Sequence, residues 1–376
     1  MAFLSAENMR DYAPDPTLGS DNNHCPADTG GLMGTERETM KKIDIFTHIW
    51  TQPFYDALRA ETGEMTNITM RSEKVPMITN LDRRFEVMDM FDDYCQVLTL
   101  ASPPLEVVST PEKALELSRI GSDSLAELCN KYPDRFPGFV GTAPMNNPDA
   151  LVEECRRAIE DLGACGMQIY SNIAGKPIDL PEFEPFFDYM ASVDKPVWIH
   201  PARNARFSDY ATEEKSLYEI WWTFGWPYET SAAMARLVFS KTFDRLPKLK
   251  VITHHAGGMI PYFEGRVGPG WDQLGARTSD VDYKILLNEL KMRPLDYFKL
   301  FYADTATFGS RMAILSALDF FGADNVLFAS DAPFDPEGGP FYIRETVRIL
   351  DALEISEEDR KKIYHGNAIK LLGLNI

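Results

Sequence analysis

The amino-acid sequence predicts an α/β protein whose main domain is a (β/α)8 TIM barrel. Three observations predict it: strand-like and helix-like segments alternate eight times, several strand-like segments end in a histidine or an aspartate, and no glycine-rich phosphate loop is present. The chain has 376 residues, a length that one barrel with a tail accounts for. We expect an N-terminal tail over residues 1–40 and one barrel domain over residues 41–376.

The first predicted strand covers residues 43–50, where apolar residues alternate with polar ones up to His48. In a parallel barrel, the C-terminal ends of the strands converge on the face that carries the active site. The next segment, residues 51–80, has little helical periodicity and is longer than an ordinary connection. We expect it to be a long functional loop.

The later segments repeat this plan. The predicted strands cover residues 96–100, 139–142, 166–170, 196–200, 249–255, 301–304 and 326–331. The predicted helices cover residues 81–92, 110–131, 147–162, 181–193, 259–267, 341–353 and 357–372. A second long loop, the aromatic excursion over residues 203–227, follows the fifth strand and can form a lid, a subunit interface, or both.

Charge and hydropathy exclude several partners. Lys and Arg number 38 against 57 Asp and Glu, which gives a formal net charge of −19 and repels phosphate groups. No uncharged apolar run approaches the roughly 20 residues that span a bilayer. We therefore expect a soluble protein with no nucleic-acid partner and no membrane partner.

The cysteines indicate the compartment. The five cysteines are odd in number and include no Cys-x-x-Cys pair, which argues against a disulfide framework and against a zinc ribbon. A reducing, cytoplasmic location is expected. Residues 1–40 show no secretory signal and are rich in Asp, Asn, Gly and Pro, so we expect a frayed tail or one that is ordered by a partner subunit.

Histidines at strand ends are the strongest functional signal. Four of the six histidines fall there, namely His48, His200, His254 and His255, and Asp331 ends the eighth strand. Neutral imidazoles and a carboxylate suit a divalent metal such as zinc, and three protein ligands leave one position for water. One such histidine alone is usually structural, but their coincidence on four strands predicts a metal site.

Five short motifs follow one another in a recognisable order. They are Ile-Asp-x-Phe-x-His at 43–48, Val-Trp-Ile-His-Pro at 197–201, His-x-Gly-Gly-x-x-Pro-Tyr at 255–262, Ser-Asp-x-Pro-Phe at 330–334 and Gly-Asn-Ala at 366–368. The set resembles the amidohydrolase superfamily, specifically the branch of aminocarboxymuconate-semialdehyde decarboxylase. The resemblance covers residues 42–376.

The resemblance implies roles for individual residues. His48, His200 and Asp331 match the metal ligands of the family, and His255 matches the histidine that activates water or protonates the substrate. His254 is expected to face the other way, because side chains alternate along a strand.

Two positions depart from the family pattern. Phe46 occupies the place of a usual ligand, so either His255 joins the metal ligands or the usual chemistry is lost. Gln168 replaces the lysine that bridges two metals in binuclear relatives, so we expect a single ion.

The resemblance and the residues together favour a mononuclear metal-dependent enzyme with one divalent ion, zinc first among the candidates. It would decarboxylate or hydrolyse a small carboxylated substrate, with His255 as acid and base. Arg203 is either the group that binds the substrate carboxylate or a surface charge.

The alternative interpretation is a metal-binding partner subunit, whose catalytic site lies in a homologous chain, as in a two-chain metal-dependent hydroxylase or oxygenase. Phe46 favours this alternative. In both cases the aromatic excursion predicts self-association or pairing with a related chain.

Overall fold

The computed structural model of the protein describes residues 40–376. The predicted tail, and with it the prediction that a partner subunit orders the tail, lies outside the described residues except for Met40. Between residues 40 and 376, no helix is both long and apolar enough to cross a bilayer.

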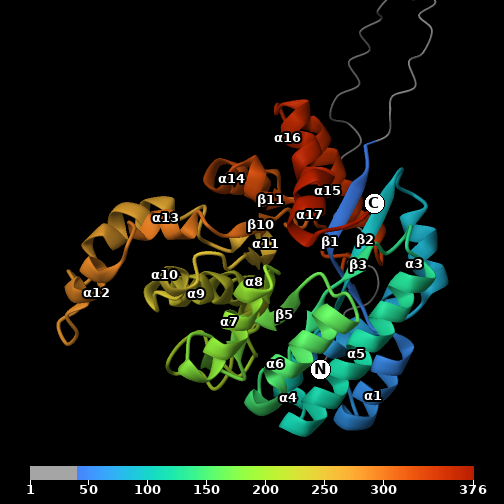
Figure 1. The fold of residues 1–376 in the computed structure, drawn as a ribbon, viewed down its shortest axis with the longest axis horizontal. Helices are drawn as coiled ribbons and strands as arrows, with labels where there is room; N and C mark the ends of the chain where they lie inside the picture. The colour runs from blue at the N-terminus through green and yellow to red at the C-terminus, as the bar shows by residue number, and fades with distance from the viewer. Residues whose placement is uncertain (1–39) are drawn as a thin grey trace, which may run out of the picture. The chain divides into compact units, whose positions relative to one another are not determined.

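Parallel strands form the centre of the described region (Figure 1). They are β1 (Lys42–Ile49), β2 (Tyr94–Leu100), β3 (Gly138–Phe139), β4 (Gly141–Thr142), β5 (Met167–Tyr170), β8 (Val197–His200), β9 (Val251–Thr253), β10 (Tyr302–Asp304) and β11 (Val326–Leu327). A short antiparallel pair, β6 (Asn172–Ile173) and β7 (Lys176–Pro177), follows β5. All the long-range strand pairs are parallel, as expected for strands joined by helical crossovers.

The three-stranded sheet and the six-stranded sheet join at two junctions, and these two junctions close the barrel. β3 and β4 are separated only by Val140; β3 pairs with β2 and β4 pairs with β5, so together they act as the third strand. The other closure joins the first strand to the segment after β11: the amide of Ile45 donates to the Phe328 carbonyl at 3.0 Å, and the amide of Asp331 donates to the Phe46 carbonyl at 3.2 Å. The predicted (β/α)8 barrel is confirmed.

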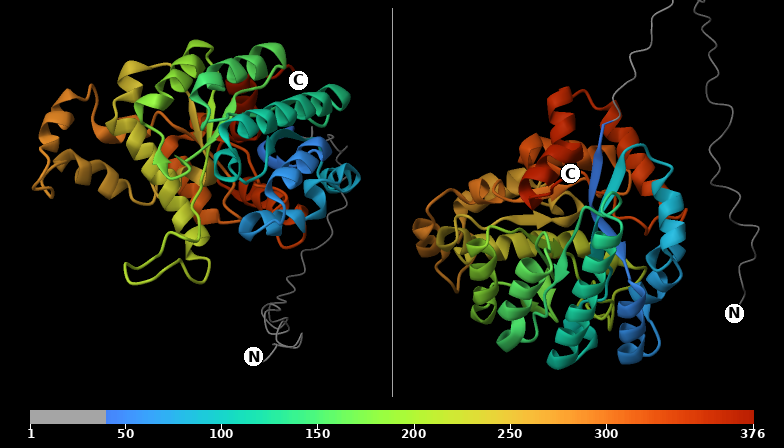
Figure 2. Two further views of the ribbon diagram at one scale, coloured as in Figure 1. Left: turned by 90° about the horizontal axis from the view of Figure 1, so that it is seen from below. Right: turned by 45° about the vertical axis from the view of Figure 1, so that its right-hand side comes forward.

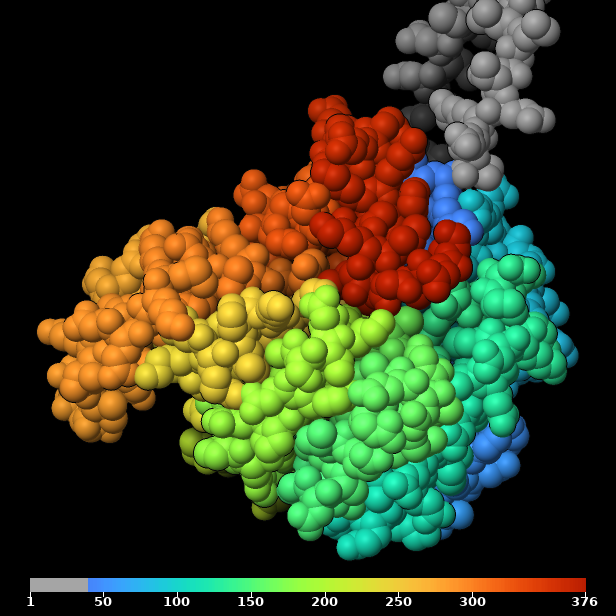
Figure 3. Space-filling view, in the orientation of Figure 1, coloured from blue at the N-terminus to red at the C-terminus, as the bar shows by residue number. Residues whose placement is uncertain are grey.

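Helices surround the strands, as the two views in Figure 2 show. They are α1 (Gln52–Thr62), α2 (Asn67–Glu73), α3 (Leu81–Met88), α4 (Leu105–Val108), α5 (Pro111–Lys131), α6 (Pro148–Arg156), α7 (Glu184–Ser192), α8 (Ile220–Thr223), α9 (Gly225–Phe239), α10 (Thr242–Arg245), α11 (His254–Gly257), α12 (Tyr283–Glu289), α13 (Pro294–Phe298), α14 (Arg311–Phe321), α15 (Pro340–Ala352), α16 (Glu357–Lys361) and α17 (Asn367–Leu372). The segment with α12 and α13 projects from the side of the barrel in the space-filling view (Figure 3), and α12 buries no residue.

The apolar core has two parts. The larger part lies between the strands and the helices. The smaller part joins side chains of the strands, such as Ile45, Val97, Trp198 and Leu327, to residues of α17 and the C-terminal segment. Residues buried on both faces explain why the strands read as continuous apolar runs in the sequence.

Two predicted elements are wrong. Residues 51–80, predicted as a long loop, contain α1 and α2. Only two residues of α1, Phe54 and Leu58, are buried, so its apolar stripe is too narrow to be read as helical periodicity. No regular α-helix covers residues 259–267, because Pro261 and nearby glycines interrupt the backbone hydrogen-bond pattern.

Candidate metal centre

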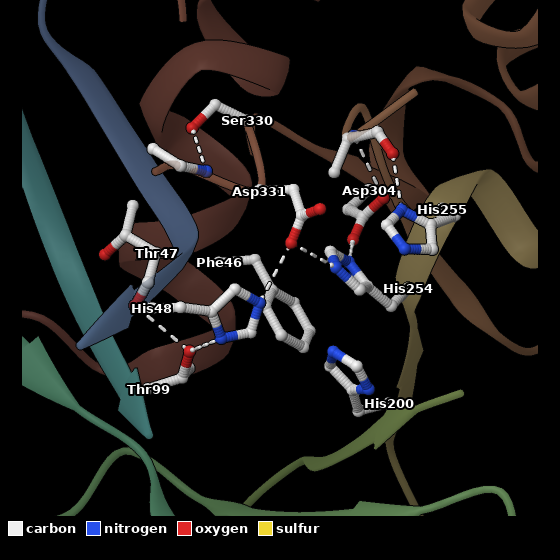
Figure 4. A network of polar contacts seen from close by, with 12 residues as sticks. Phe46, Thr47, His48, Thr99, His200, His254, His255, Asp304, Ser330 and Asp331 are labelled. Carbon is white, nitrogen blue, oxygen red and sulfur yellow. Dashed lines mark hydrogen bonds and ion pairs between the residues drawn. The ribbon is translucent and has the colours of Figure 1, made fainter. Parts of the chain in front are cut away.

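Four side chains meet at the C-terminal end of the barrel strands (Figure 4). His48 lies near the end of β1, His200 is the last residue of β8, His254 directly follows β9, and Asp331 follows β11. All four are buried. Because strand ends converge in a barrel, residues from four distant parts of the chain come together here.

These side chains lie close enough to one another to bind one metal ion together. The Nε2 atoms of His48 and His254 lie 2.9 and 3.2 Å from Oδ1 of Asp331. Ligand atoms of His48, His200 and His254 all lie within 4.8 Å of one another, and the same holds for His254, His255 and Asp331. His254 belongs to both groups.

The prediction that His254 faces away from the centre is wrong. Regular strand β9 ends at Thr253, and the backbone then turns, with left-handed φ values of 58° at His255 and 57° at Ala256. The alternation of side chains holds only within a regular strand. The two neighbouring rings therefore stack on the same side, with centroids 3.7 Å apart.

A contact at Nδ1 with a group outside the centre orients each imidazole. Nδ1 of His200 lies 2.7 Å from the Pro201 carbonyl, and Nδ1 of His255 lies 2.7 Å from the Ala306 carbonyl. A carbonyl only accepts, so these Nδ1 atoms carry the proton and the Nε2 atoms are free to bind. Nδ1 of His254 contacts the carboxylate of Asp304 in the same way.

His48 follows the same rule through a hydroxyl. The Thr99 hydroxyl donates to the Thr47 carbonyl at 3.0 Å, so at 3.1 Å it accepts from Nδ1 of His48. Nε2 of His48 is buried and has no hydrogen bond of good geometry within the described residues, although it faces Asp331. A buried nitrogen lone pair of this kind fits a divalent cation, so the residues present suit a metal site.

The charges of the centre are strongly coupled. Burial alone would raise the pKa of Asp331, but its hydrogen bond with His254 and the close imidazole of His48 hold this pKa well below its usual range. Burial lowers the pKa of His254, yet Asp304 and Asp331 outweigh it and raise this pKa to about 9. Burial lowers the pKa values of His48 and His200. Burial and the neighbouring charge of His254 together lower the pKa of His255 to about 4.

The two departures from the family pattern are both buried. The ring of Phe46 packs against the histidines, with its centroid 5.3 Å from that of His48 and 5.9 Å from that of His200. It fills space where a ligand was expected. The amide of Gln168 donates to the Leu100 carbonyl at 3.3 Å.

A small hollow of about 30 Å³ borders the centre, and a larger cavity of about 390 Å³ lies beside it. Arg203 lines the larger cavity, where it forms an ion pair with Glu229 at 2.9 Å. The structure therefore does not bring Arg203 to the metal residues. Arg71 of α2 lines the small hollow together with His200 and Asp331, and sequence reasoning missed it because residues 51–80 had no recognised helix.

The aromatic excursion has two sides. Trp221 and Trp226 line the larger cavity, whereas Tyr218 and Phe224 are exposed. Self-association through the exposed side stays a prediction, which light scattering can test.

Comparison with known proteins defines the class of this chain. Residues 43–374 match the family described as Amidohydrolase, and the chain belongs to this family. It is 31% identical to gamma-resorcylate decarboxylase of Rhizobium sp. (strain MTP-10005), over 78% of this chain and 87% of the relative. It is 30% identical to 2-amino-3-carboxymuconate-6-semialdehyde decarboxylase of Dictyostelium discoideum, over 78% and 77% of the two chains.

A solved structure shows the same likeness. Dihydroxybenzoic acid decarboxylase from Polaromonas sp. JS666, with bound manganese and the inhibitor 2-nitroresorcinol, superposes with a TM-score of 0.71 and 26% identity, covering 90% of this chain and 98% of that chain. The expected membership of the amidohydrolase superfamily and the expected metal-dependent enzyme of its decarboxylase-like branch are both confirmed.

Proposed function

We propose that this chain catalyses the non-oxidative decarboxylation of a small aromatic acid and needs one divalent cation. The observation that carries the proposal is the convergence of imidazole Nε2 atoms and one carboxylate at the strand ends, beside a hollow that Arg71 lines. The names of the relatives support the same reaction.

His48, His200, His254 and Asp331 would hold the cation. A divalent cation held there would supply positive charge that stabilises an anionic substrate. Three imidazoles and a carboxylate suit zinc, and manganese is the ion in the solved relative. One ion is proposed, since Gln168 cannot bridge two.

His255 is the proposed proton carrier. In the reaction the bond between the ring carbon and the carboxylate breaks, carbon dioxide leaves, and the electron pair that stays on the ring carbon takes up a proton. The Ala306 carbonyl holds Nδ1 of His255, which leaves Nε2 to carry that proton. A proton from solvent then restores His255.

Several of the side chains that line the hollow are aromatic. Trp222, Trp226, Phe308 and Phe334 line it, and they exclude water from the reacting atoms. Arg71 also lines this hollow; its guanidinium donates to the Phe334 carbonyl and has further N–H groups that could bind a substrate carboxylate.

The test uses the purified chain loaded in turn with manganese or zinc. We expect release of carbon dioxide and the matching phenol from a ring-hydroxylated benzoate, and loss of this activity in His255→Gln with the metal retained. His365→Gln, which removes a histidine outside the centre, is the control. Hydrolysis of an ester or lactone without carbon dioxide release would instead favour a hydrolase.

The partner-subunit alternative keeps one supporting observation, the phenyl ring of Phe46 in a ligand position. It requires that the isolated chain be inactive and that a related chain restore turnover. Activity of the isolated chain that depends on His255 would reject it.

We also propose a cytoplasmic location. Within residues 40–376 the four cysteines are unpaired, which fits a reducing compartment.

A further inference from the structure

The hollow beside the metal centre is too small for a whole aromatic acid. Its volume of about 30 Å³ holds roughly two water molecules. The neighbouring cavity measures about 390 Å³, within the range of small-molecule sites of roughly 300–1,000 Å³. Ile68, Ser102 and Trp226 line both spaces, so they adjoin, and a substrate held at the metal must extend into the larger cavity.

One carboxyl group in the larger cavity has an oxygen atom without a hydrogen bond. Glu106 of α4 lines the cavity, and its side chain is 9% exposed. Its Oε1 atom is buried without a hydrogen bond, and no ion pair involves it among residues 40–376. Buried polar groups in proteins are nearly always hydrogen-bonded, so an unpaired one in a cavity indicates a missing ligand.

The other charges of the cavity do not neutralise Glu106. Arg203 pairs with Glu229 at 2.9 Å, and Glu229 also accepts from Asn172 at 3.2 Å. Arg206 also lines the cavity, but it forms no ion pair with Glu106 among the described residues. Burial raises the pKa of Glu106 to about 7, as expected for a carboxyl group without a nearby cation. The hydroxyl of Tyr170 lies in the same cavity, where burial raises its pKa above the ordinary value. A ligand group that donates hydrogen bonds would remove this cost.

We infer that the larger cavity is a second substrate subsite, in which Glu106 accepts a hydrogen bond from an amino or hydroxyl substituent remote from the reacting carboxylate. The inference rests on the proposed function, because the reacting carboxylate defines which end of the substrate is remote. It assigns Glu106 a role in substrate selection, not in the chemical step.

The test uses ligands that bind without reacting. In 2-nitroresorcinol a nitro group replaces the carboxylate, so the compound cannot lose carbon dioxide. Three derivatives carry aminomethyl, hydroxymethyl or ethyl at position 5, opposite the nitro group. Calorimetry on the manganese-loaded full chain gives their dissociation constants.

We expect the aminomethyl and hydroxymethyl compounds to bind wild type about tenfold or more tightly than the ethyl compound, since a carboxylate strengthens the hydrogen bonds it accepts. In Glu106→Leu this preference should fall below threefold. Glu106→Gln should keep the preference for hydroxymethyl and lose that for aminomethyl, which separates the two kinds of donor. Glu127→Gln, an exposed glutamate of α5, is the matched control and should behave as wild type.

Equal binding of the three compounds to wild type, a preference that persists in Glu106→Leu, or no binding at all would overturn the inference. A thermal midpoint that falls in Glu106→Leu would also count against it, because it would assign Glu106 a structural partner. Failure of the proposed function is visible separately: the wild-type chain would release no carbon dioxide from any hydroxybenzoate, whatever the nitro compounds do.

Discussion

The ring of Phe46 lies flat on the ring of His254, with centroids 3.7 Å apart and 15° between the planes. The contact fixes the plane of an imidazole whose two nitrogens already face Asp304 and Asp331. Phe46 occupies a position where relatives of this fold were expected to supply a ligand, and here it packs on His254, the ligand that we propose from the sixth strand.

The variant Phe46→Ala tests this supporting role. We expect the free energy of unfolding to fall by about 3–5 kcal/mol, because a fully buried phenyl ring is removed. Turnover should fall as well, while about one metal ion per chain is retained. Chemical denaturation and elemental analysis measure the two effects. Loss of the metal in Phe46→Leu, which leaves a much smaller void, would show that the ring does more than support His254.

Two neighbouring alanine variants separate ligand from proton carrier. His254→Ala should abolish metal retention, because it removes the residue common to both groups of ligand atoms. His255→Ala should keep the metal and lose turnover. Elemental analysis after gel filtration gives the metal content. The reverse pattern, with metal lost in His255→Ala only, would make His255 the ligand.

Metal binding should release a proton at neutral pH. The metal-free centre holds His254 with a pKa of about 9, so at pH 7 this imidazole is protonated and must lose its proton to bind an ion. His48 and His200, with lowered pKa values, are already neutral, and Asp331 is already ionised. We therefore expect release of about one proton per ion.

Because metal binding is expected to release a proton, metal affinity should increase with pH. Metal affinity should rise about tenfold per pH unit between pH 7 and pH 9, and level off above pH 9. Calorimetry in buffers of different ionisation enthalpy counts the protons. Affinity that is flat from pH 7 to pH 9 would show that His254 binds no proton in the metal-free protein.

The two arginines can be compared directly. Arg71→Ala should raise KM for the acid at least tenfold, because Arg71 lines the hollow beside His200 and Asp331. Arg203→Ala should raise KM less, since its guanidinium is paired with Glu229. Steady-state kinetics of carbon dioxide release measure both. A larger effect at Arg203 would restore the role that the sequence suggested for it.

Much of this architecture could be predicted, because the strands of a barrel have a recognisable pattern in the sequence. Strands buried on both faces are short apolar runs, and His48, His200 and Asp331 stand where those runs end. The strand predicted over residues 301–304 likewise places the carboxylate of Asp304 at the end of β10. Its contact with His254 was not, because pairing across the barrel depends on tertiary structure.

The failures have local causes. The orientation of His254 could not be predicted, because it depends on left-handed backbone angles at His255 and Ala256, two residue types that rarely adopt them. Arg71 and Glu106 lie on short helices with few buried residues, so neither helix has a clear periodic pattern. The partners of a side chain in a cavity, or their absence, have no counterpart in the order of the residues.

The closure of the barrel also fixes when the metal centre can form during synthesis. His48 leaves the ribosome early and Asp331 late, and the amide of Asp331 bonds to the Phe46 carbonyl only when the last strand has joined the first. A nascent chain that has not yet reached residue 331 lacks the carboxylate ligand that we propose. Stable metal uptake therefore requires that synthesis has passed residue 331, and chains that stall before this residue are expected to remain metal-free.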